Sequence, residues 1–551
     1  MPGLRITTGS GGMAREKMTG VDTAWLRMDS PANLMMIVGV EIFDTPIAYD
    51  ALAQRLTDRF LTYDRFRQKV VAEGGGYCWE DDEDFDIANH LVPTRLPGEA
   101  GDAELRELMA ELSSQPLDPD RPLWEFRYVE NYKGTVAVVI RIHHCIADGI
   151  ALVNVTLSMT DGWKAPAPRA RDAHDTHDDE PHHEGTHAWS SIIEPITRTA
   201  VKAAEATGGA LGASVDIAAD PEGLEALATV GSQVIKDALK VGLMSADSDT
   251  SLKGTPGGRK AVAWNEPMPL DEVKAVCKVL GVSVNDVLLS CVTGAIHHYL
   301  EGRGEPAAGK EFRAMVPVNL RPPDAPPSLG NRFGLVPLVL PIGIANPVER
   351  LYEVRRRMNE LKQGYQGQIA FAILGAVGLA PKGVQRMLLD YLAQKGSAVM
   401  TNVPGPREHV TIAGVKLRQV IFWVPQSGSI GVGVSILSYG GAVQFGLITD
   451  TDLCAQPQAI IDAFQPEFER LVLTLCMLPR ELVGAGPLDG QEIERRLLSR
   501  DGPAQSPAPA PKRAAGSRRG PASKAGASSP TPRPSPRAKA ARSRAKATVA
   551  A

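Results

Sequence analysis

The sequence predicts an α/β (α+β) protein made of two mixed-sheet domains of similar size, joined by a helical crossover and followed by a disordered tail. Segments with the apolar pattern of strands alternate with helical segments in two separate stretches of the chain. Polar sequence of low complexity interrupts the chain twice, and 551 residues are too many for one ordinary core. We expect an N-terminal domain at residues 1–165 and a crossover at residues 166–255. A C-terminal domain should follow at residues 256–485, and a tail at residues 502–551.

The first stretch contains three segments rich in β-branched residues and two with helical periodicity. The expected strands are Met36–Phe43, Leu123–Glu130 and Thr135–His143, and the expected helices are Ala103–Leu112 and Gly149–Met159.

The second stretch repeats this mixture, and helix-rich sequence between Ile192 and Gly242 would bridge the two stretches. The expected helices are Leu270–Leu280, Asn285–Leu300 and Pro347–Gln363. The expected strands are Arg313–Asn319, Phe333–Leu340, Ser397–Val403, Val410–Val424 and Val443–Thr449. Two mixed domains joined by a crossover are the economical interpretation of this order.

The crossover begins with a histidine-rich segment, HDTHDDEPHHEGTH, which holds His174, His177, His182, His183 and His187. A cluster of His and Asp is compatible with metal binding. The segment is polar throughout, however, and has no apolar scaffold to fix the geometry of ligands. We therefore favour an exposed linker and expect no metal site.

Composition indicates a globular protein, with 43% hydrophobic and 22% charged residues. The six cysteines are far apart and form no CxxC, which is typical of reduced thiols in the cytosol. No signal peptide is apparent, and no apolar run reaches the roughly 18 residues that span a bilayer. The longest run, Ile369–Pro381, is either a buried helix or a segment that dips into lipid.

The predicted tail holds eleven Lys or Arg and no acidic residue. It has almost no large apolar side chain and cannot bury a core, so we expect disorder. Its positive charge suits anionic lipid headgroups or nucleic acid. A solubilising extension without a specific partner explains the composition equally well.

The strongest chemical signal is His143-His144-Cys145-Ile146-Ala147-Asp148-Gly149, directly after the apolar strand Thr135–Arg141. Functional groups of α/β proteins gather where strands run into loops. A neutral histidine there can accept a proton near pH 7 and return it later in the reaction. The chain has no Walker loop, GxSxG elbow or HExxH motif to compete with this site.

HHxxxDG at a strand end resembles the motif of the CoA-dependent acyltransferase superfamily, which includes chloramphenicol acetyltransferase and condensation domains. The sequence is most similar to the bacterial wax ester synthase/diacylglycerol acyltransferase family, over roughly residues 15–480. Further family-like motifs are MTGVDTAWLRMDSPANLMMIVGV, Pro122-Leu123-Trp124, Asn285-Asp286, Leu329-Gly330-Asn331 and Thr401-Asn402-Val403-Pro404-Gly405-Pro406. The resemblance implies two chloramphenicol-acetyltransferase-like domains.

The resemblance also implies a role for each residue of the HHxxxDG motif. His144 would be the general base, with His143 supporting the loop. Asp148 would form a structural ion pair with an arginine, although it could instead orient His144 as in a catalytic triad. Gly149 would allow a tight turn or a close backbone approach.

Two asparagines in family-like motifs, Asn285 and Asn402, are candidates to stabilise the oxyanion of the tetrahedral intermediate. Each also has a structural interpretation. Asn285 follows Ser283 in a possible helix cap, and Asn402 precedes a proline-glycine turn. Ser438-Tyr439 is a weaker third candidate.

Two other groups of residues near these motifs have structural interpretations. We interpret Trp124 and Glu125 as core packing and an ion pair. The His297-His298 pair falls inside a predicted helix, as a surface or core feature.

The resemblance implies transfer of a fatty acyl group from long-chain acyl-CoA to diacylglycerol, which gives triacylglycerol. A long-chain fatty alcohol as acceptor would give a wax ester instead. A carrier-dependent condensation enzyme and a catalytically silent lipid-binding protein are alternatives from other classes. Acyl-CoA is a substrate, so no cofactor is expected, nor is a specific nucleic acid partner. The expected location is cytoplasmic, with peripheral contact at a membrane or lipid-droplet surface.

Overall fold

The computed structural model describes residues 15–163, 244, 247–321, 329–362, 364, 366–379 and 382–477. The chain divides into two units, Met1–Leu498 and Ser499–Ala551, and every described residue belongs to the first. The predicted helical bridge between Ile192 and Gly242, the histidine-rich segment and the predicted tail lie outside the described residues. The domain boundaries proposed above stay a prediction.

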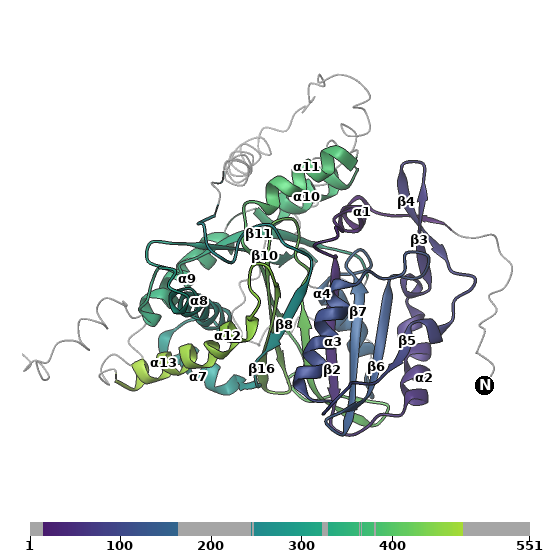
Figure 1. Ribbon diagram of the computed structural model, residues 1–551, viewed down its shortest axis with the longest axis horizontal. Coiled ribbons are helices and arrows are strands. Elements are labelled where there is room, and N and C mark those ends of the chain that lie inside the picture. The colour runs from purple at the N-terminus through teal and green to yellow at the C-terminus, as the bar shows by residue number, and fades with distance from the viewer. Residues whose placement is uncertain are drawn as a thin grey trace, which may run out of the picture. The chain divides into compact units, whose positions relative to one another are not determined.

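The N-terminal sheet has six strands in the order β13-β14-β2-β7-β6-β5 (Figure 1). Its central strands are apolar on both faces, as expected of strands covered on both sides. The strands are β2 (Met36–Phe43), β5 (Leu91–Thr94), β6 (Trp124–Tyr132), β7 (Thr135–His143), β13 (Thr411–Ile412) and β14 (Val415–Trp423).

The C-terminal sheet has seven strands, six of them in the order β11-β10-β12-β15-β16-β8, with β9 also paired to β16. Its strands are β8 (Lys260–Trp264), β9 (Met268–Pro269), β10 (Phe312–Asn319), β11 (Phe333–Leu340), β12 (Ala398–Pro404), β15 (Val432–Tyr439) and β16 (Ala442–Asp450). A small third sheet joins β1 (Glu16–Lys17), β4 (Gly76–Asp81) and β3 (Gln68–Glu73).

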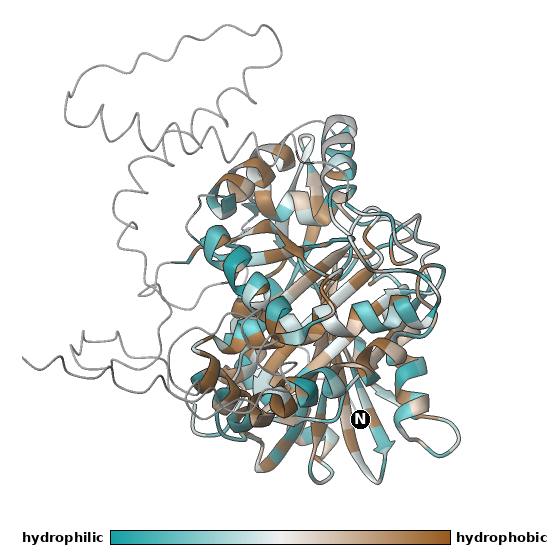
Figure 2. Ribbon diagram, turned by 90° about the vertical axis from the view of Figure 1, so that its left-hand side faces the viewer, coloured by the Kyte–Doolittle hydropathy of each residue, from teal (hydrophilic) through white to brown (hydrophobic). Residues whose placement is uncertain are grey.

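Helices cover these sheets, and Figure 2 shows mostly apolar strands beside helices with a hydrophilic side. The helices of the N-terminal region are α1 (Gly20–Arg27), α2 (Tyr49–Arg59), α3 (Asp102–Ser114) and α4 (Gly149–Ser158), with short 3-10 turns at Phe60–Thr62, Asp64–Phe66 and Ile87–Asn89. The others are α7 (Leu270–Leu280), α8 (Val284–Gly302), α9 (Pro347–Lys362), α10 (Gln366–Leu379), α11 (Lys382–Ala393), α12 (Pro457–Asp462) and α13 (Phe464–Met477).

The two sheets share a core at the end of β7. Apolar side chains of α1, α4 and the N-terminal sheet pack there against Phe333, Val403 and Leu437 of the C-terminal sheet. A separate core lies between the C-terminal sheet and helices α7, α8, α9, α12 and α13. The motif that carries the expected chemistry therefore lies where the two sheets meet.

One predicted strand pairs differently from the expectation. The segment Val410–Val424 was expected among the strands of the C-terminal domain. It forms two strands, and β14 pairs antiparallel with β2, with Phe422 opposite Gly39. Alternation of apolar residues identifies a strand but does not specify its partner, because either sheet can bury the same face.

Within the described residues no single helix has both the length and the apolar composition to cross a membrane. The helices α7 and α8 pass that test as a pair, but a bend of 101° separates them. Most of the α8 side chains lie in the C-terminal core.

Candidate active site at the junction of the two sheets

The HHxxxDG loop connects the buried strand β7 to helix α4. His143 is the last residue of β7 and pairs in register with Met36 of β2. Asp148 is the N-cap of α4, and its carboxylate accepts a hydrogen bond of 3.0 Å from the Ala151 amide. Strand pairing fixes one end of the loop and helix capping fixes the other.

His144 is almost fully enclosed, with 7% of its surface exposed. The indole of Trp25, from α1, stacks on the imidazole with ring centroids 4.3 Å apart and an interplanar angle of 15°. Phe333, at the start of β11, contacts the imidazole at 5.5 Å between centroids. Two aromatic rings therefore confine the plane of the imidazole.

Asn331 holds His144 through both ends of its amide. Its Oδ1 lies 2.8 Å from Nδ1 of His144, and its Nδ2 donates to the His144 carbonyl at 2.7 Å. The same Nδ2 donates to Oδ1 of Asp22 at 2.8 Å. Asn331 comes from the loop between β10 and β11, so the C-terminal sheet contributes directly to the surroundings of the histidine.

Burial determines the charge of His144. It lowers the pKa of the imidazole from 6.5 to about 4, although the Asp148 carboxylate and the Asn331 amide favour the protonated form. The side chain is therefore neutral at pH 7 and can accept a proton. Its ring hydrogen bond to a described residue is the one at Nδ1, and Nε2 has no hydrogen-bond partner among those residues.

His143 has different partners. Its Nε2 lies 3.2 Å from Oδ2 of Asp29, and its Nδ1 accepts the Cys145 amide N–H at 3.1 Å. Burial lowers the pKa of His143, whereas the neighbouring Cys145 and Asp29 raise it. Burial raises the pKa of the Cys145 thiol, so no thiolate charge is expected beside the ring. The amide N–H facing Nδ1 also leaves no place for a second ring proton, so we assign His143 the neutral form with its proton on Nε2.

Asp148 faces the C-terminal sheet rather than His144. Its Oδ2 accepts hydrogen bonds from Nη1 of Arg321 at 2.5 Å and from the Arg332 amide at 3.0 Å. Arg321 also donates to the Gly330 carbonyl at 2.7 Å. The geometry is that of an ion pair and a helix cap, and no hydrogen bond joins Asp148 to an imidazole within the described part of the chain.

The structure shows neither a left-handed turn nor a close contact at Gly149, so its expected role stays a prediction. Gly149 is the first residue of α4 and does not have a positive φ. A Cβ atom there would meet no atom within 4 Å. Because the Asp148 carboxylate caps the helix, the chain enters α4 without a left-handed residue, and none of the described backbone lies within 4 Å of a Cβ atom placed on Gly149.

Asn285 and Asn402 are hydrogen-bonded to each other, and neither is hydrogen-bonded to His144 within the described residues. Nδ2 of Asn402, on β12, donates to Oδ1 of Asn285, on α8, at 3.2 Å. The predicted helix cap is confirmed, because Ser283 and Asp286 form reciprocal hydrogen bonds of 3.2 and 2.9 Å. Asn285 only accepts in this bond, and the two hydrogens of its Nδ2 have no acceptor among the described residues.

The other candidates have structural partners. Tyr439 donates its hydroxyl to the Leu417 carbonyl at 2.7 Å and accepts the Val410 amide at 3.1 Å. Trp124 is buried, and Glu125 pairs with Arg141 at 2.9 Å, which confirms core packing and an ion pair.

The predicted helical position of the second histidine pair is also confirmed. In α8, His297 contacts the Ile342 carbonyl at 2.7 Å and His298 contacts Glu467 at 2.7 Å. Within the described residues, no group of three or more His, Cys, Asp or Glu side chains could hold a metal ion.

Sequence reasoning missed the residues that surround His144 and Asp148, namely Asp22, Trp25, Arg321 and Asn331. Three of them stand in segments that the family resemblance singled out, VDTAW and Leu329-Gly330-Asn331. The resemblance marked these segments as family-like but did not show that their side chains contact His144.

Comparisons with known proteins agree with this geometry. A profile of the wax ester synthase/diacylglycerol acyltransferase catalytic domain matches residues 18–288, and a profile of the WS/DGAT C-terminal domain matches residues 329–472. A wax ester synthase/diacylglycerol acyltransferase from Marinobacter aquaeolei VT8 shares the fold, with a TM-score of 0.58 and 21% sequence identity. That comparison covers 83% of this chain and 99% of the other.

Two similar sequences come from Mycobacterium tuberculosis. A protein of strain H37Rv named probable diacylglycerol O-acyltransferase is 27% identical over 471 residues, which cover 83% of this chain and 95% of that protein. A second protein of the same description, from strain CDC 1551, is 26% identical over 453 residues, covering 78% and 92%.

An HHxxxDG loop at the junction of two mixed sheets, together with these matches, defines the protein as an acyltransferase. The chain belongs to the wax ester synthase/diacylglycerol acyltransferase family.

Proposed function

We propose that this acyltransferase moves a fatty acyl group from acyl-CoA to the free hydroxyl of diacylglycerol, with His144 as general base. The observation that supports the role of His144 is a buried, neutral imidazole whose Nε2 is free of hydrogen bonds to described residues. The names of the two mycobacterial relatives support diacylglycerol as the acceptor.

The transfer requires one proton to move twice. Nε2 of His144 removes the hydroxyl proton as the oxygen attacks the thioester carbon, which forms the C–O bond and a tetrahedral oxyanion. Collapse of this intermediate breaks the C–S bond, and the imidazolium returns the proton to the leaving CoA thiolate. Triacylglycerol and free CoA are the products, and His144 is neutral again.

Burial makes His144 a weak base, so the proton transfer needs support in the transition state. The Asp148 carboxylate and the Asn331 amide both favour the imidazolium. The enclosing rings of Trp25 and Phe333 keep water away from the base. In our proposal His143 and Asp148 hold the loop in place and exchange no proton with the substrates.

The oxyanion needs a hydrogen-bond donor. We assign this role to Nδ2 of Asn285, because its hydrogens have no acceptor among the described residues. The hydrogen bond that Asn402 donates to Oδ1 of Asn285 orients that amide.

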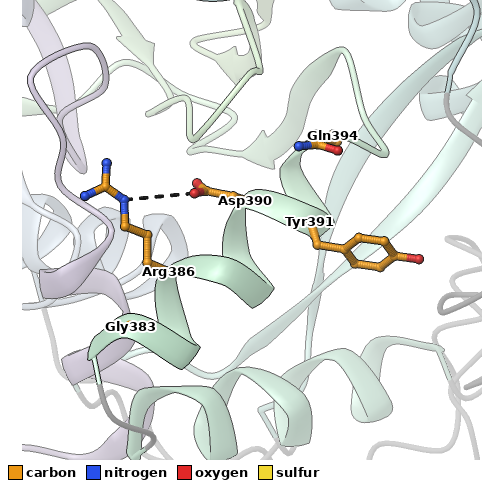
Figure 3. Close-up of a pocket in the computed structure, with 5 residues that line it drawn as sticks. All are labelled: Gly383, Arg386, Asp390, Tyr391 and Gln394. Atoms are coloured by element: carbon orange, nitrogen blue, oxygen red, sulfur yellow. Dashed lines mark ion pairs between the residues drawn. The ribbon is translucent and has the colours of Figure 1, made fainter.

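Contact with a lipid surface follows from the proposed substrate, and we assign it to α10 and α11. Ile373 on α10 and Tyr391 on α11 are exposed apolar or aromatic side chains. Lys382 and Arg386 on α11 are also exposed. Arg386 and Tyr391 line an open surface hollow of about 530 Å³ together with Gly383, Asp390 and Gln394 (Figure 3). Exposed apolar groups beside cations suit an anionic lipid interface.

The acceptor is tested with purified protein, labelled palmitoyl-CoA, and either diacylglycerol or hexadecanol. Transfer to diacylglycerol by the unmodified protein, and its loss in His144→Ala, are the expected results. Faster transfer to hexadecanol would make the protein a wax ester synthase. No transfer to either acceptor would favour a lipid-binding protein.

The lipid contact is tested by flotation with vesicles that contain anionic phospholipid. Replacing Ile373 with Glu and Arg386 with Glu should reduce the bound fraction. Deletion of residues 503–551 separates this contact from one made by the basic tail. Unchanged flotation of the double α10–α11 variant, with loss on deleting the tail, would refute the assignment to α10 and α11.

A further inference from the structure

We infer that Asn331 is a positioning residue that keeps the ring proton of His144 on Nδ1 and so leaves Nε2 as the base. This inference rests on the proposed role of His144 and adds a residue that acts through it. Asn331 is buried, with 5% of its surface exposed, and its amide contacts both the ring and the backbone of His144.

The orientation of the Asn331 amide follows from its neighbours. One end of the amide lies 2.7 Å from the His144 carbonyl and 2.8 Å from Oδ1 of Asp22, and both of those atoms are acceptors. That end must be the NH2 group, so the carbonyl oxygen Oδ1 faces Nδ1 of His144. An amide oxygen only accepts, and therefore Nδ1 of His144 must donate.

This contact selects one of the two neutral tautomers. With the proton on Nδ1, the ring donates to Oδ1 of Asn331 at 2.8 Å, and the lone pair of Nε2 is free. The other tautomer would place two lone pairs face to face at that distance and would leave a buried acceptor unsatisfied. It would also put the proton on Nε2, where a base must have none.

Asp22 prevents the amide from turning over. Its Oδ1 accepts from Nδ2 of Asn331, while its Oδ2 accepts the Thr19 hydroxyl at 2.7 Å. Thr19 is the N-cap of α1, and its hydroxyl oxygen accepts the Asp22 amide at 3.1 Å. A rotated Asn331 would direct its oxygen at the Asp22 carboxylate and at the His144 carbonyl, which is repulsive at both positions.

The network links three parts of the fold. Helix α1 supplies Asp22 and the stacked Trp25, the β10–β11 loop supplies Asn331, and the end of β7 supplies His144. The backbone supports this junction, because Gly330 N–H donates to the Ile146 carbonyl at 3.1 Å. The backbone of His144 itself also favours a proton on the ring, but the contribution of Asn331 depends on the two sheets being docked together.

The test compares Asn331→Leu, which removes the amide, with Asn331→Asp, which keeps an acceptor at Nδ1. In Asn331→Leu we expect kcat to fall on the order of 10²-fold, with the KM for palmitoyl-CoA within about twofold of the unmodified protein. Asn331→Asp should retain more activity than Asn331→Leu. In Asn331→Asp, the fall of kcat/KM at acidic pH should begin at a higher pH than in the unmodified protein, because a carboxylate beside the ring favours the imidazolium.

The tautomer is measured directly by 15N NMR of histidine-labelled protein, with the His144 signals assigned by their absence in His144→Gln. The unmodified protein should show Nδ1 protonated and Nε2 unprotonated, and Asn331→Leu should show loss of that pattern. Asn265→Leu is the matched control, because Asn265 is also buried and hydrogen-bonded but contacts Gln444 and Phe445. The Asn265→Leu variant should have a lower melting temperature, with kcat and the tautomer of His144 unchanged.

Retention of both the tautomer and kcat in Asn331→Leu would overturn the inference. So would losses of activity and of melting temperature that match those of Asn265→Leu, since they would indicate a purely structural residue. Failure of the proposed function is distinguishable. In that case His144→Gln would keep its transfer rate, whatever the Asn331 variants do.

Discussion

Arg321 and Asp148 join the two sheets beside the active-site loop, with Nη1 of Arg321 2.5 Å from Oδ2 of Asp148. The arginine follows β10 of the C-terminal sheet. The aspartate belongs to the HHxxxDG motif and is the N-cap of α4. Both side chains are mostly buried. The loop that carries His144 is therefore fastened by a buried ion pair that spans the junction.

Loss of one partner of this pair should destabilise the protein. Replacing Arg321 with Met leaves the Asp148 carboxylate buried without its cation and should lower the free energy of unfolding by about 3 kcal/mol. Asp148→Asn keeps a helix cap and should cost less. In urea denaturation the double variant should lose less than the sum of the two single variants. Strict additivity would mean that the ion pair does not couple the two residues.

The enzyme should keep its activity to an unusually low pH. Burial lowers the pKa of His144 to about 4, so the imidazole stays neutral well below pH 6.5. The ratio of kcat/KM at pH 5.5 to that at pH 7.5 should be near one, whereas a base with an ordinary pKa would give about 0.1. A tenfold fall over this range, with the fold intact by circular dichroism, would contradict the burial of the base.

Glu41 should make the protein less stable as pH rises. This carboxyl lies in the middle of β2, and burial raises its pKa from 4.5 to about 7. The folded state therefore binds more protons than the unfolded state between these values, and stability falls as pH rises through that window. Glu41→Gln removes the effect. Its gain in the free energy of unfolding should grow from below about 1 kcal/mol at pH 5 to about 3 kcal/mol at pH 8.

Thermal or urea unfolding of both proteins at the two pH values measures this gain. Glu41 has a useful comparison in Glu353, a half-buried carboxylate on α9 that is paired with Arg356 and Arg357 and whose pKa is lowered to about 2. Glu353→Gln should show no stabilisation at pH 8. An equal gain of Glu41→Gln at pH 5 and pH 8 would indicate a packing effect rather than a buried charge.

The side-chain amides of Asn285 and Asn402 should differ in their effect on kcat. If Nδ2 of Asn285 donates to the oxyanion, Asn285→Ala should lower kcat by about 10²- to 10³-fold. Asn402→Ala removes only the hydrogen bond that orients Asn285, so its effect should be smaller. Steady-state kinetics with palmitoyl-CoA measure both variants. A larger loss for Asn402→Ala would reverse the assignment.

Much of the fold was predictable because its strands and helices are strongly patterned. Strands β2, β7 and β11 and helix α7 begin and end at the residues expected from apolar periodicity. The motif at the end of β7 was also evident, since it stands where a buried strand meets a turn and a helix. Strand β15, Val432–Tyr439, was not predicted, although apolar side chains fill it.

The partners of the motif were not predictable in the same way. Asn331 is 187 positions from His144 in sequence, and Arg321 is 173 positions from Asp148. Their meeting depends on how two sheets dock, and side-chain periodicity within one element contains no information about docking. The same limit explains why β14 was expected in the C-terminal domain and pairs with β2 instead.

The most direct test of His144 as the general base is acyl transfer by His144→Gln, compared with His143→Gln and the unmodified protein. All three are assayed with labelled palmitoyl-CoA and diacylglycerol, and their palmitoyl-CoA binding and melting temperatures are measured in parallel. We expect His144→Gln to bind palmitoyl-CoA normally but to lose transfer on the order of 10³-fold or more, while His143→Gln loses less. A His144→Gln protein that forms triacylglycerol at the rate of the unmodified enzyme would contradict the assignment of the base.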